Sequence, residues 1–580
     1  MLFSLRSLIR RQSPKPVASN PGYNANVERI RDEEYPQLKG VFNLPSLPSF
    51  FELTCVVWSG QVYLDHSGTT LYAESLLTSI SADFRKNLYG NPHSANPSSK
   101  LSSGKVDAIR VKVLQLFKAD PAKFDVVFCA NTTAGVKLVS DSFAGHPKEF
   151  EYRFHKDCHT SLIGPRGLAE SSQCFDSDDK VREWLADTIG ESGDEKLGLF
   201  AWPGQSNFSG RRLPVHEWAS QLRKSHPNYY SMLDAAALVM TSPLDLSDEE
   251  SSPDFIVCSF YKMFGYPDLG ALIVRRSSAE VLQHRRFFGG GTVSQLMSSM
   301  PHTMKRFDSD PHEHLEDGTC AFHSIIALGH AIDTHERLFG SFSRISLHTS
   351  SLASLLAGLL SNLTHPLTGR KAVEIYTEET HSDPKAQGPV ITINLSTATG
   401  ECIGYLAVEA AAAARNIHIR SGGHCNPGGV QQYCGLSPAE MKANFDAGKV
   451  CGDDQDVING KPTGAVRVSL GAMSTLDDVL RFVAFIKEEY VDKHSVSFAE
   501  RRKMLLGERK KEVAEAKKLM KKYGTVVSTG SGGSGKTLLC FWADSVNLGE
   551  KTMHVGVRKA SPGASPTASV ASVNLPAIAA

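Results

Sequence analysis

The chain has 580 residues, 41% of them hydrophobic and 21% charged, a composition typical of a globular protein rather than a fibrous or disordered one. Its 62 basic residues balance its 62 acidic ones, so the basic excess of a nucleic-acid-binding protein is missing. No apolar run approaches the roughly 18 residues that a membrane span needs. The length exceeds what a single core fills, so we expect at least two domains.

The cysteines show no CxxC pair and no metal-ligand spacing. Eleven cysteines spread over so long a chain predict reduced thiols in an intracellular protein, and we expect a cytoplasmic one. Residues 1–22 hold arginines among Leu and Ile and no acid, which predicts a disordered arm or a mitochondrial targeting segment, the alternative location.

The first ordered element that we expect is a charged helix from Val27 to Leu38. After it, residues 41–61 are mostly apolar but have neither a helical nor a strand period. They interrupt the passage from the helix to the strand-like VYLDH that starts at Val62. We interpret residues 41–61 as an insertion or a retained intron within the first domain.

Compact apolar runs follow and predict buried strands at residues 124–130, 196–203, 229–237, 254–260 and 269–275. Helical stretches such as residues 106–117 separate several of these runs. Continuous apolar strands between helices predict an α/β fold, with a mainly parallel sheet covered on both faces. We assign this large domain to residues 23–340.

A second, smaller α/β domain is expected over residues 341–495, where GPVITINL and AVRVSLG supply strands. Residues 496–522 predict a highly charged helix, and residues 523–580 form a Gly-, Ser- and Pro-rich tail that we expect to be disordered. The tail contains GSGGSGKT, which fits the P-loop pattern. We interpret this stretch as a linker, because the strands and the acidic Mg²⁺ motif of a nucleotide-binding domain do not follow it.

Two residues follow predicted strands and suit a pyridoxal phosphate (PLP) enzyme. Lys262 comes just after the run DFIVCSF, and Asp234 ends the run YYSMLD. PLP needs a lysine to bond its aldehyde and a carboxylate to keep its ring nitrogen protonated. Ligands of open α/β sheets bind beyond the carboxyl ends of the strands, where we expect both residues. Each has an ordinary alternative, a surface charge for Lys262 and a turn cap for Asp234.

A phosphate site is predicted where ANTTAGVKLV joins a strand to a helix. We expect free N–H groups and the hydroxyls of Thr132 and Thr133 to gather at that helix N-terminus. Ser259, three residues before Lys262, is a further candidate contact. The alternative is an ordinary helix cap.

Cys425 stands in SGGHCNPGG, among glycines and a proline. This pattern predicts a mobile loop whose thiol can approach a substrate, and such a cysteine is a candidate nucleophile. The alternative is a buried, inert cysteine. The run His312, Glu313 and His314 is better explained by a polar loop than by a metal site, so we predict no bound metal.

Together, these and other segments resemble the N-terminal domain of the molybdenum cofactor sulfurase family, which is similar to the class V aminotransferase-like cysteine desulfurases. The resemblance covers most of residues 23–492, apart from residues 41–61. It implies the type I fold of PLP-dependent transferases, with a seven-stranded type of sheet in the large lobe. The segments that carry it are LDHSGTT, YGNPHSANPSS, CHTSLIG, PGQSNFSGRR, LDAAALVMTSPLDL, SFYKMFGYPDLGALIV, FFGGGTV, HLEDGT, IHIRSGGHCNPGG, KVCGDD and PTGAVRVSLGAMSTLDDV.

The resemblance also implies roles for single residues around the PLP ring. Lys262 would bond the aldehyde, and Asp234 would pair with the pyridine nitrogen. His159 would stack on the ring face and move protons. Asn207 would contact the phenolic oxygen of the ring.

Further roles implied by the resemblance concern the phosphate. Thr133 and Ser259 would hold it, beside Thr132. Thr292 would reach the phosphate of a partner subunit, which makes a homodimer the expected assembly.

For the substrate, the resemblance implies L-cysteine. Arg467 would clamp its carboxylate, a bidentate task suited to a guanidinium. Cys425, as a thiolate, would take the sulfur and become a persulfide while alanine leaves. The sulfur would then go to the molybdenum cofactor or to a separate acceptor protein. Two alternatives stay open: another class V PLP enzyme (a selenocysteine lyase, epimerase or aminotransferase), and a non-catalytic PLP-fold scaffold.

Some features depart from the pattern of cysteine desulfurases. Tyr261 replaces the histidine that commonly precedes the lysine, and Ala237 replaces the glutamine that usually follows the aspartate by three residues. Both replacements agree with the sulfurase branch. The residues after Asp492 do not resemble the β-rich domain of a full sulfurase, so we expect the desulfurase part alone.

Overall fold

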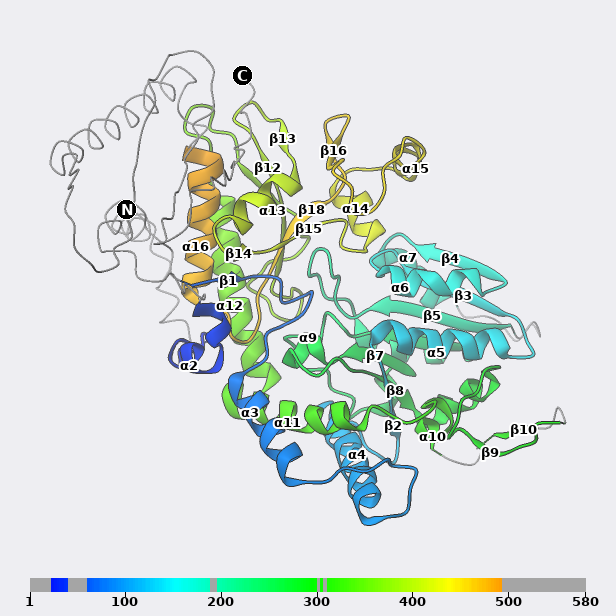
Figure 1. The fold of residues 1–580 in the computed structure, drawn as a ribbon. Coiled ribbons are helices and arrows are strands. Elements are labelled where there is room, and N and C mark those ends of the chain that lie inside the picture. Colours follow the sequence, from blue (N-terminus) through cyan, green and yellow to red (C-terminus); the bar gives the residue numbers. More distant parts are fainter. Residues whose placement is uncertain (1–21, 40–59, 188–195, 300–302, 306–309, 493–580) are drawn as a thin grey trace, which may run out of the picture. The chain divides into compact units, whose positions relative to one another are not determined.

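The computed structural model describes residues 22–39, 60–187, 196–299, 303–305 and 310–492 (Figure 1). These residues belong to one compact unit. The predicted N-terminal arm, nearly all of the segment 41–61, the charged helix and the tail with GSGGSGKT lie outside the described residues. Within the described part of the chain, no helix is both long and apolar enough to span a membrane.

The larger of two sheets has seven strands in the order β2-β8-β7-β6-β5-β3-β4 (Figure 1). Neighbouring strands are parallel except where β8 runs against β2 and β7. The α/β class and the mainly parallel sheet are therefore confirmed. The strands are β2 (Phe124–Cys129), β3 (Phe150–His155), β4 (Ser171–Phe175), β5 (Leu197–Pro203), β6 (Tyr229–Asp234), β7 (Phe255–Ser259) and β8 (Gly270–Arg275).

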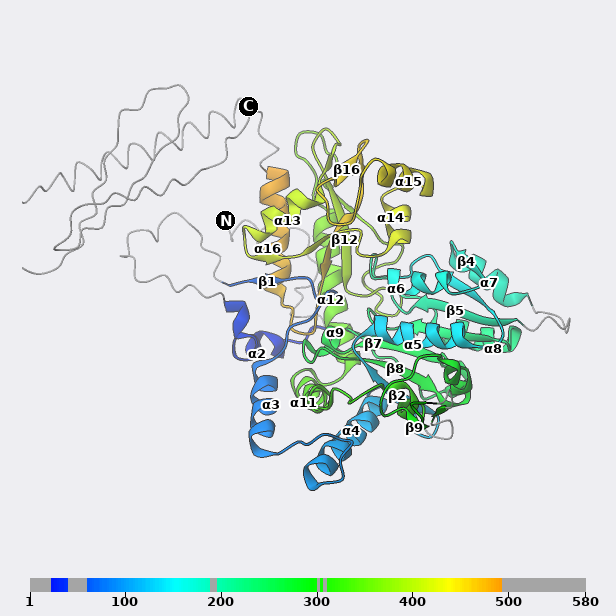
Figure 2. The same ribbon diagram turned by 45° about the vertical axis from the view of Figure 1, so that its right-hand side comes forward.

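Apolar side chains alternate between the two faces of this sheet and pack under helices on both. Val127 and Val257 lie in the core beneath α5, whereas Val126 and Ile256 lie in the opposite core. On that opposite face, α4 and α11 pack side by side (Figure 2). We call the sheet with these helices the large lobe. The helices are α4 (Pro97–Leu116), α5 (Thr132–Gly145), α7 (Asp178–Ala186), α8 (Val215–Ser225) and α11 (Phe322–Phe339).

The smaller sheet is antiparallel and has the order β11-β12-β18-β15, with β13 paired to β12. Its core includes Val62 and Leu64, because β1 (Val62–Tyr63) pairs with β14 (Ile417–His418). We call this sheet with its helices the small lobe. Its elements are β11 (Val373–Ile375), β12 (Val390–Ser396), β13 (Cys402–Ile403), β15 (Arg420–Gly422), β18 (Ala465–Ser469), α12 (Phe342–Ser361), α13 (Tyr405–Ala413) and α16 (Leu476–Ile486).

The predicted charged helix from Val27 to Leu38 is wrong at its end. It stops as α2 (Asn26–Glu34), because Pro36 lacks an N–H and its ring excludes the helical conformation before it. Leu38 falls in a separate 3-10 turn. The other described elements are α3 (Glu74–Lys86), α6 (Thr160–Ile163), α9 (Tyr261–Phe264), α10 (Pro311–Leu315), α14 (Pro427–Tyr433), α15 (Pro438–Asp446), β9 (Val293–Leu296), β10 (Thr303–Lys305), β16 (Val457–Ile458) and β17 (Lys461–Pro462).

Candidate active site

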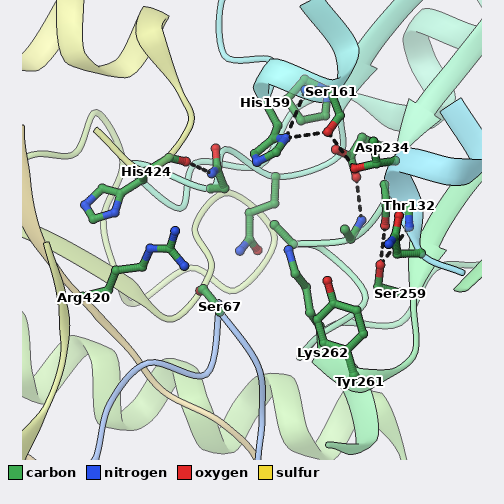
Figure 3. A pocket seen from close by; sticks show the side chains of 18 of the residues that line it. Ser67, Thr132, His159, Ser161, Asp234, Ser259, Tyr261, Lys262, Arg420 and His424 are labelled. Carbon is green, nitrogen blue, oxygen red and sulfur yellow. Dashed lines mark hydrogen bonds between the residues drawn. The ribbon is translucent and has the colours of Figure 1, made fainter. Parts of the chain in front are cut away.

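A cavity of about 230 Å³ lies at the carboxyl ends of β2, β5, β6 and β7, where the small lobe meets the large one. Figure 3 shows Lys262 reaching into it, with Asp234 and Thr132 on one side and Arg420 on the other. Parallel strands deliver their carboxyl ends to the same edge, which explains why loops distant in sequence meet here. The lining residues are Ser67, Gly68, Asn131, Thr132, Thr133, His159, Ser161, Pro203, Gln205, Asn207, Asp234, Ala236, Ala237, Ser259, Tyr261, Lys262, Arg420, His424 and Arg467.

Lys262 and Asp234 both lie in this cavity. Burial lowers the pKa of the Lys262 amine, the charge of Asp234 opposes this shift, and Arg467 adds to it. Asp234 is buried, and its Oδ1 accepts a hydrogen bond of 2.9 Å from the N–H of Ala236. The amine therefore has a larger neutral, nucleophilic fraction than a surface lysine.

The ring of His159 is held in one orientation. Its Nδ1 accepts a hydrogen bond of 3.2 Å from the N–H of Ser161, so the proton of the neutral ring sits on Nε2. Burial lowers the pKa of His159, Asp234 acts against this, and Lys262 lowers it further. The neutral imidazole can therefore exchange a proton with the cavity through Nε2.

Hydroxyl groups cluster at the N-terminus of α5. The Thr132 and Ser259 hydroxyl oxygens are 2.7 Å apart, and those of Thr133 and Ser161 are 2.8 Å apart. Asn131 caps α5 by accepting the N–H of Ala134. Such a helix end, with its hydroxyl groups and positive dipole, favours a phosphate group.

Arg467 lies on β18 and enters the cavity from the small lobe. Its Nη2 is 3.1 Å from Asp65 Oδ1, and its Nη1 donates a 3.0 Å hydrogen bond to the carbonyl of Asn207. Arg420 is paired with Arg467 in the β15–β18 register. Among the described residues, the guanidinium of Arg420 has no hydrogen bond or ion pair. The cavity thus presents two guanidinium groups on its small-lobe side.

Cys425 is exposed, but it is not among the residues that line the cavity. The loop that carries it is fastened to the large lobe. The carbonyl of Cys425 accepts a 2.9 Å hydrogen bond from the N–H of Thr160, the neighbour of His159. Asn207 Nδ2 donates to the carbonyl of His424 at 2.7 Å. The backbone at Cys425 therefore lies beside the cavity and next to the His159 segment.

Thr292 lies outside this cavity. It is buried, and its hydroxyl donates a 2.8 Å hydrogen bond to the carbonyl of Gly289 in the same chain. His312 is paired with Asp125 at 2.8 Å. In the described part of the chain, no group of three or more His, Cys, Asp or Glu residues is arranged to hold a metal ion.

Sequence reasoning missed several cavity residues, among them Ser67, Ser161, Gln205 and Arg420. Arg420 had a usable signal, because it stands five residues before Cys425 in the same segment. The others come from loops without a strong local pattern. Their places depend on which strand ends are neighbours, which no single segment specifies.

The lining residues fit PLP. An amine of lowered pKa, a buried carboxylate with only one oxygen bonded to the chain, and a hydroxyl cluster at a helix N-terminus match its aldehyde, ring nitrogen and phosphate. Described residues that line the cavity thus supply a partner for each of these three parts of PLP.

The Aminotransferase class-V family model matches residues 62–482, and the chain belongs to this family, which implies PLP as its cofactor. The chain is 47% identical over 480 residues to the molybdenum cofactor sulfurase of Aspergillus fumigatus, covering 81% of this chain and 54% of that protein. It is 48% identical over 477 residues to that of Aspergillus niger, covering 81% and 55%. The chain thus spans about half the length of these curated relatives.

Solved structures show the same fold. A cysteine desulfurase from Thermococcus onnurineus has a TM-score of 0.58 at 19% identity, covering 74% of this chain and 94% of that one. A cysteine desulfurase from Escherichia coli has a TM-score of 0.56 at 18% identity, with 74% and 94% covered. The predicted type I fold is therefore confirmed.

Proposed function

We propose that this chain is a PLP-dependent L-cysteine desulfurase that forms a persulfide on Cys425 and releases L-alanine. The observation that carries the proposal is an exposed cysteine, Cys425, whose backbone carbonyl accepts a hydrogen bond from the residue after His159. This cysteine stands beside the cavity that Lys262 and Asp234 line. The reaction balances, because L-cysteine and the Cys425 thiol give L-alanine and the Cys425 persulfide. The name of the relatives, molybdenum cofactor sulfurase, supports an activity that transfers sulfur.

When bound, PLP supplies an aldehyde that takes up an amino acid and a protonated ring that accepts electrons. Lys262 provides the amine for attachment and can move a proton at the substrate carbon. Asp234 keeps the ring nitrogen protonated, and the Thr132–Ser259 cluster holds the phosphate. Arg467, oriented by Asp65, binds the substrate carboxylate with two parallel hydrogen bonds.

His159 and Cys425 act on the sulfur side. The Nε2 of His159 exchanges protons, because its Nδ1 is committed to Ser161. Cys425 attacks the substrate sulfur as a thiolate, and the thiol proton leaves with the alanine product or solvent. Because Cys425 starts outside the cavity lining, its side chain must turn inward to reach that sulfur.

The test is L-alanine formation from L-cysteine by the purified holoenzyme. We expect the wild-type protein to release alanine and Cys425→Ala to release none, with the PLP absorbance unchanged. Cys451→Ala is the matched control, because Cys451 is also exposed but lies elsewhere in the small lobe. Bound PLP with no alanine from the wild type contradicts the proposal and favours another class V reaction or a scaffold.

The destination of the sulfur and the assembly belong to the same proposal. We propose the molybdenum cofactor, or a separate protein that carries sulfur to it, as acceptor, as the names of the relatives suggest. We also propose a homodimer in which Thr292 approaches the partner's phosphate. A stable PLP-bound monomer in sedimentation experiments would contradict the dimer. The cytoplasmic location, with the mitochondrion as alternative, remains a prediction that fractionation tests.

A further inference from the structure

The Cys425 loop has an unfavourable backbone conformation that something must hold. His424 has φ = 53° and Cys425 has φ = 54°, so two consecutive residues with side chains adopt the left-handed region. Such a conformation is uncommon outside glycine, because the Cβ atom crowds the backbone there. It persists only where contacts with the surroundings compensate for the strain.

Two of those contacts are carbonyl bonds to the large lobe. The carbonyls of His424 and Cys425 accept hydrogen bonds from Asn207 Nδ2 and Thr160 N, as described above. The loop itself runs from β15 to α14 in the small lobe. The two bonds therefore join the lobes on either side of the thiol.

Asn426 is the side chain that organises these contacts. It is 1% exposed, and its Nδ2 donates to the carbonyl of Asp157 at 3.1 Å and to Asn207 Oδ1 at 2.9 Å. Its Oδ1 accepts the N–H of Gly429 at 2.8 Å and so caps α14. Both amide protons and the amide oxygen are used, which fixes the orientation of the group.

We propose that Asn426 is a positioning residue that holds the Cys425 thiol at the mouth of the cavity, acting through Asn207. By donating to Asn207 Oδ1, it turns Asn207 Nδ2 toward the carbonyl of His424. The second Nδ2 proton of Asn207 stays available to the cavity, which Asn207 lines. One amide thus links the cavity to the loop. The inference rests on the proposed function, in which Cys425 takes the sulfur.

The decisive variant is Asn426→Asp, which has almost the same shape. A carboxylate still accepts the N–H of Gly429 and keeps the cap of α14. It cannot donate, so it places an acceptor against the carbonyl of Asp157 and against Asn207 Oδ1. This variant therefore separates the effect of the helix cap, which is kept, from the effect of the two donated hydrogen bonds, which are lost.

The matched control is Asn96→Asp. Asn96 caps α4, and its amide oxygen accepts from the Ser99 N–H at 3.0 Å and from the Ser98 hydroxyl at 2.8 Å. A carboxylate preserves these bonds and adds the same charge. We expect this variant to behave as the wild type.

Two readouts test the proposal on the full-length protein. In Asn426→Asp, hydrogen exchange at the Thr160 amide should accelerate about tenfold, because its acceptor Cys425 is no longer held. The kcat for alanine formation should fall about tenfold, while the KM for L-cysteine and the PLP absorbance stay unchanged. Wild-type exchange at Thr160, or a wild-type kcat, overturns the proposal.

A second variant tests the proposal if Asn426→Asp does not fold. Thr160→Pro removes the N–H that binds the carbonyl of Cys425, together with the threonine hydroxyl, at the first position of α6, where proline is tolerated. His159 precedes it with ψ = 151°, a conformation that a following proline accepts. A wild-type kcat in Thr160→Pro overturns the proposal. If the wild-type protein forms no alanine, the proposed function fails, and exchange at Thr160 in Asn426→Asp still decides whether Asn426 holds the loop.

Discussion

The two sides of the cavity are built in different ways. On the large-lobe side, Asp234, Ser259 and Lys262 sit at or next to the ends of strands buried on both faces. On the small-lobe side, Cys425 depends on a strained loop and a few hydrogen bonds between lobes. The comparison teaches that the proposed cofactor-binding residues are fixed by the core, whereas Cys425, the proposed sulfur acceptor, is held by contacts that single substitutions can release.

The largest effect is expected at the sheet ends. Lys262→Ala removes the amine that we propose to attach PLP and to move a proton, so alanine formation should fall by about 1000-fold or more. The absorbance of bound PLP should also change, whereas Cys425→Ala should leave it intact. Lys137→Ala, an exposed lysine on α5, is the control. If the PLP spectrum of Lys262→Ala is unchanged, Lys262 does not bind the cofactor, and the proposed division between a cofactor side and a sulfur side is wrong.

A smaller effect is expected for the substrate clamp of the small lobe. Arg467→Lys keeps the charge but loses the two parallel N–H donors, so the KM for L-cysteine should rise about 10- to 100-fold. PLP binding should be unaffected, because Arg467 enters the cavity from β18 of the small lobe, away from Asp234 and the hydroxyl groups at α5. Steady-state kinetics check this. The control is Arg415→Lys, because Arg415 forms an ion pair with Glu489 and does not line the cavity. A rise in the Kd of PLP without a rise in KM would contradict the assignment.

A buried ion-pair cluster within the large lobe should make stability depend on pH. Burial raises the pKa of Asp178, but the nearby His155 and the Arg211 guanidinium outweigh it and lower this pKa well below its ordinary value. A lowered carboxyl pKa contributes stability above the unfolded value of about 4 and loses it as the pH falls toward the folded value. Asp178→Asn should therefore cost about 1–2 kcal/mol at pH 7 and less at pH 3.5.

Urea unfolding at the two pH values measures this difference. Asp179→Asn is the control, because the Asp179 side chain is 84% exposed and pairs only with Arg182 on the surface. Equal losses at pH 7 and pH 3.5 would contradict the role of the Asp178 carboxylate.

The smallest effect is expected from removing residues 40–59. The N–H of Gln61 donates a 2.7 Å hydrogen bond to the carbonyl of Leu38. Joining Lys39 to Gly60 would make this the closing bond of a four-residue turn, with Gly60, at φ = 100°, in the position where a type II turn takes glycine. We expect a Tm within about 2 °C of the full chain and the same PLP absorbance. A large loss of stability would contradict our interpretation of residues 41–61 as an insertion.

Much of the large lobe was predictable from the sequence, because its central strands are buried on both faces and stand out as apolar runs. The strands β3 and β4 were not predicted. In β3, half-buried charged residues alternate with buried aromatic ones, and β4 (Ser171–Phe175) is an edge strand with only Phe175 buried. Edge strands need few apolar residues, so their sequences resemble loops.

The residues of the candidate site likewise divide into those that the sequence predicted and those that it did not. Asp234 and Lys262 were predictable from their positions after apolar runs, and both lie in the cavity. The role of Asn426 could not be predicted from the sequence, because its hydrogen bonds reach Asp157 and Asn207, more than 200 positions away in sequence. The predicted mobility of the Cys425 loop came from its glycines. The hydrogen bonds that fasten it involve backbone groups, which the identities of the residues do not reveal.

Arg420, unpaired among the described residues, has a consequence for the speed at which ligands arrive. Of the described residues that line the cavity, one is a lysine, Lys262, two are arginines, Arg420 and Arg467, and Asp234 is the single acid. A concave site of this sign concentrates field lines and attracts anions from a distance. The bimolecular rate constant for PLP uptake by the apoprotein therefore falls as added salt shortens the screening length from about 30 Å at 0.01 M to about 3 Å at 1 M.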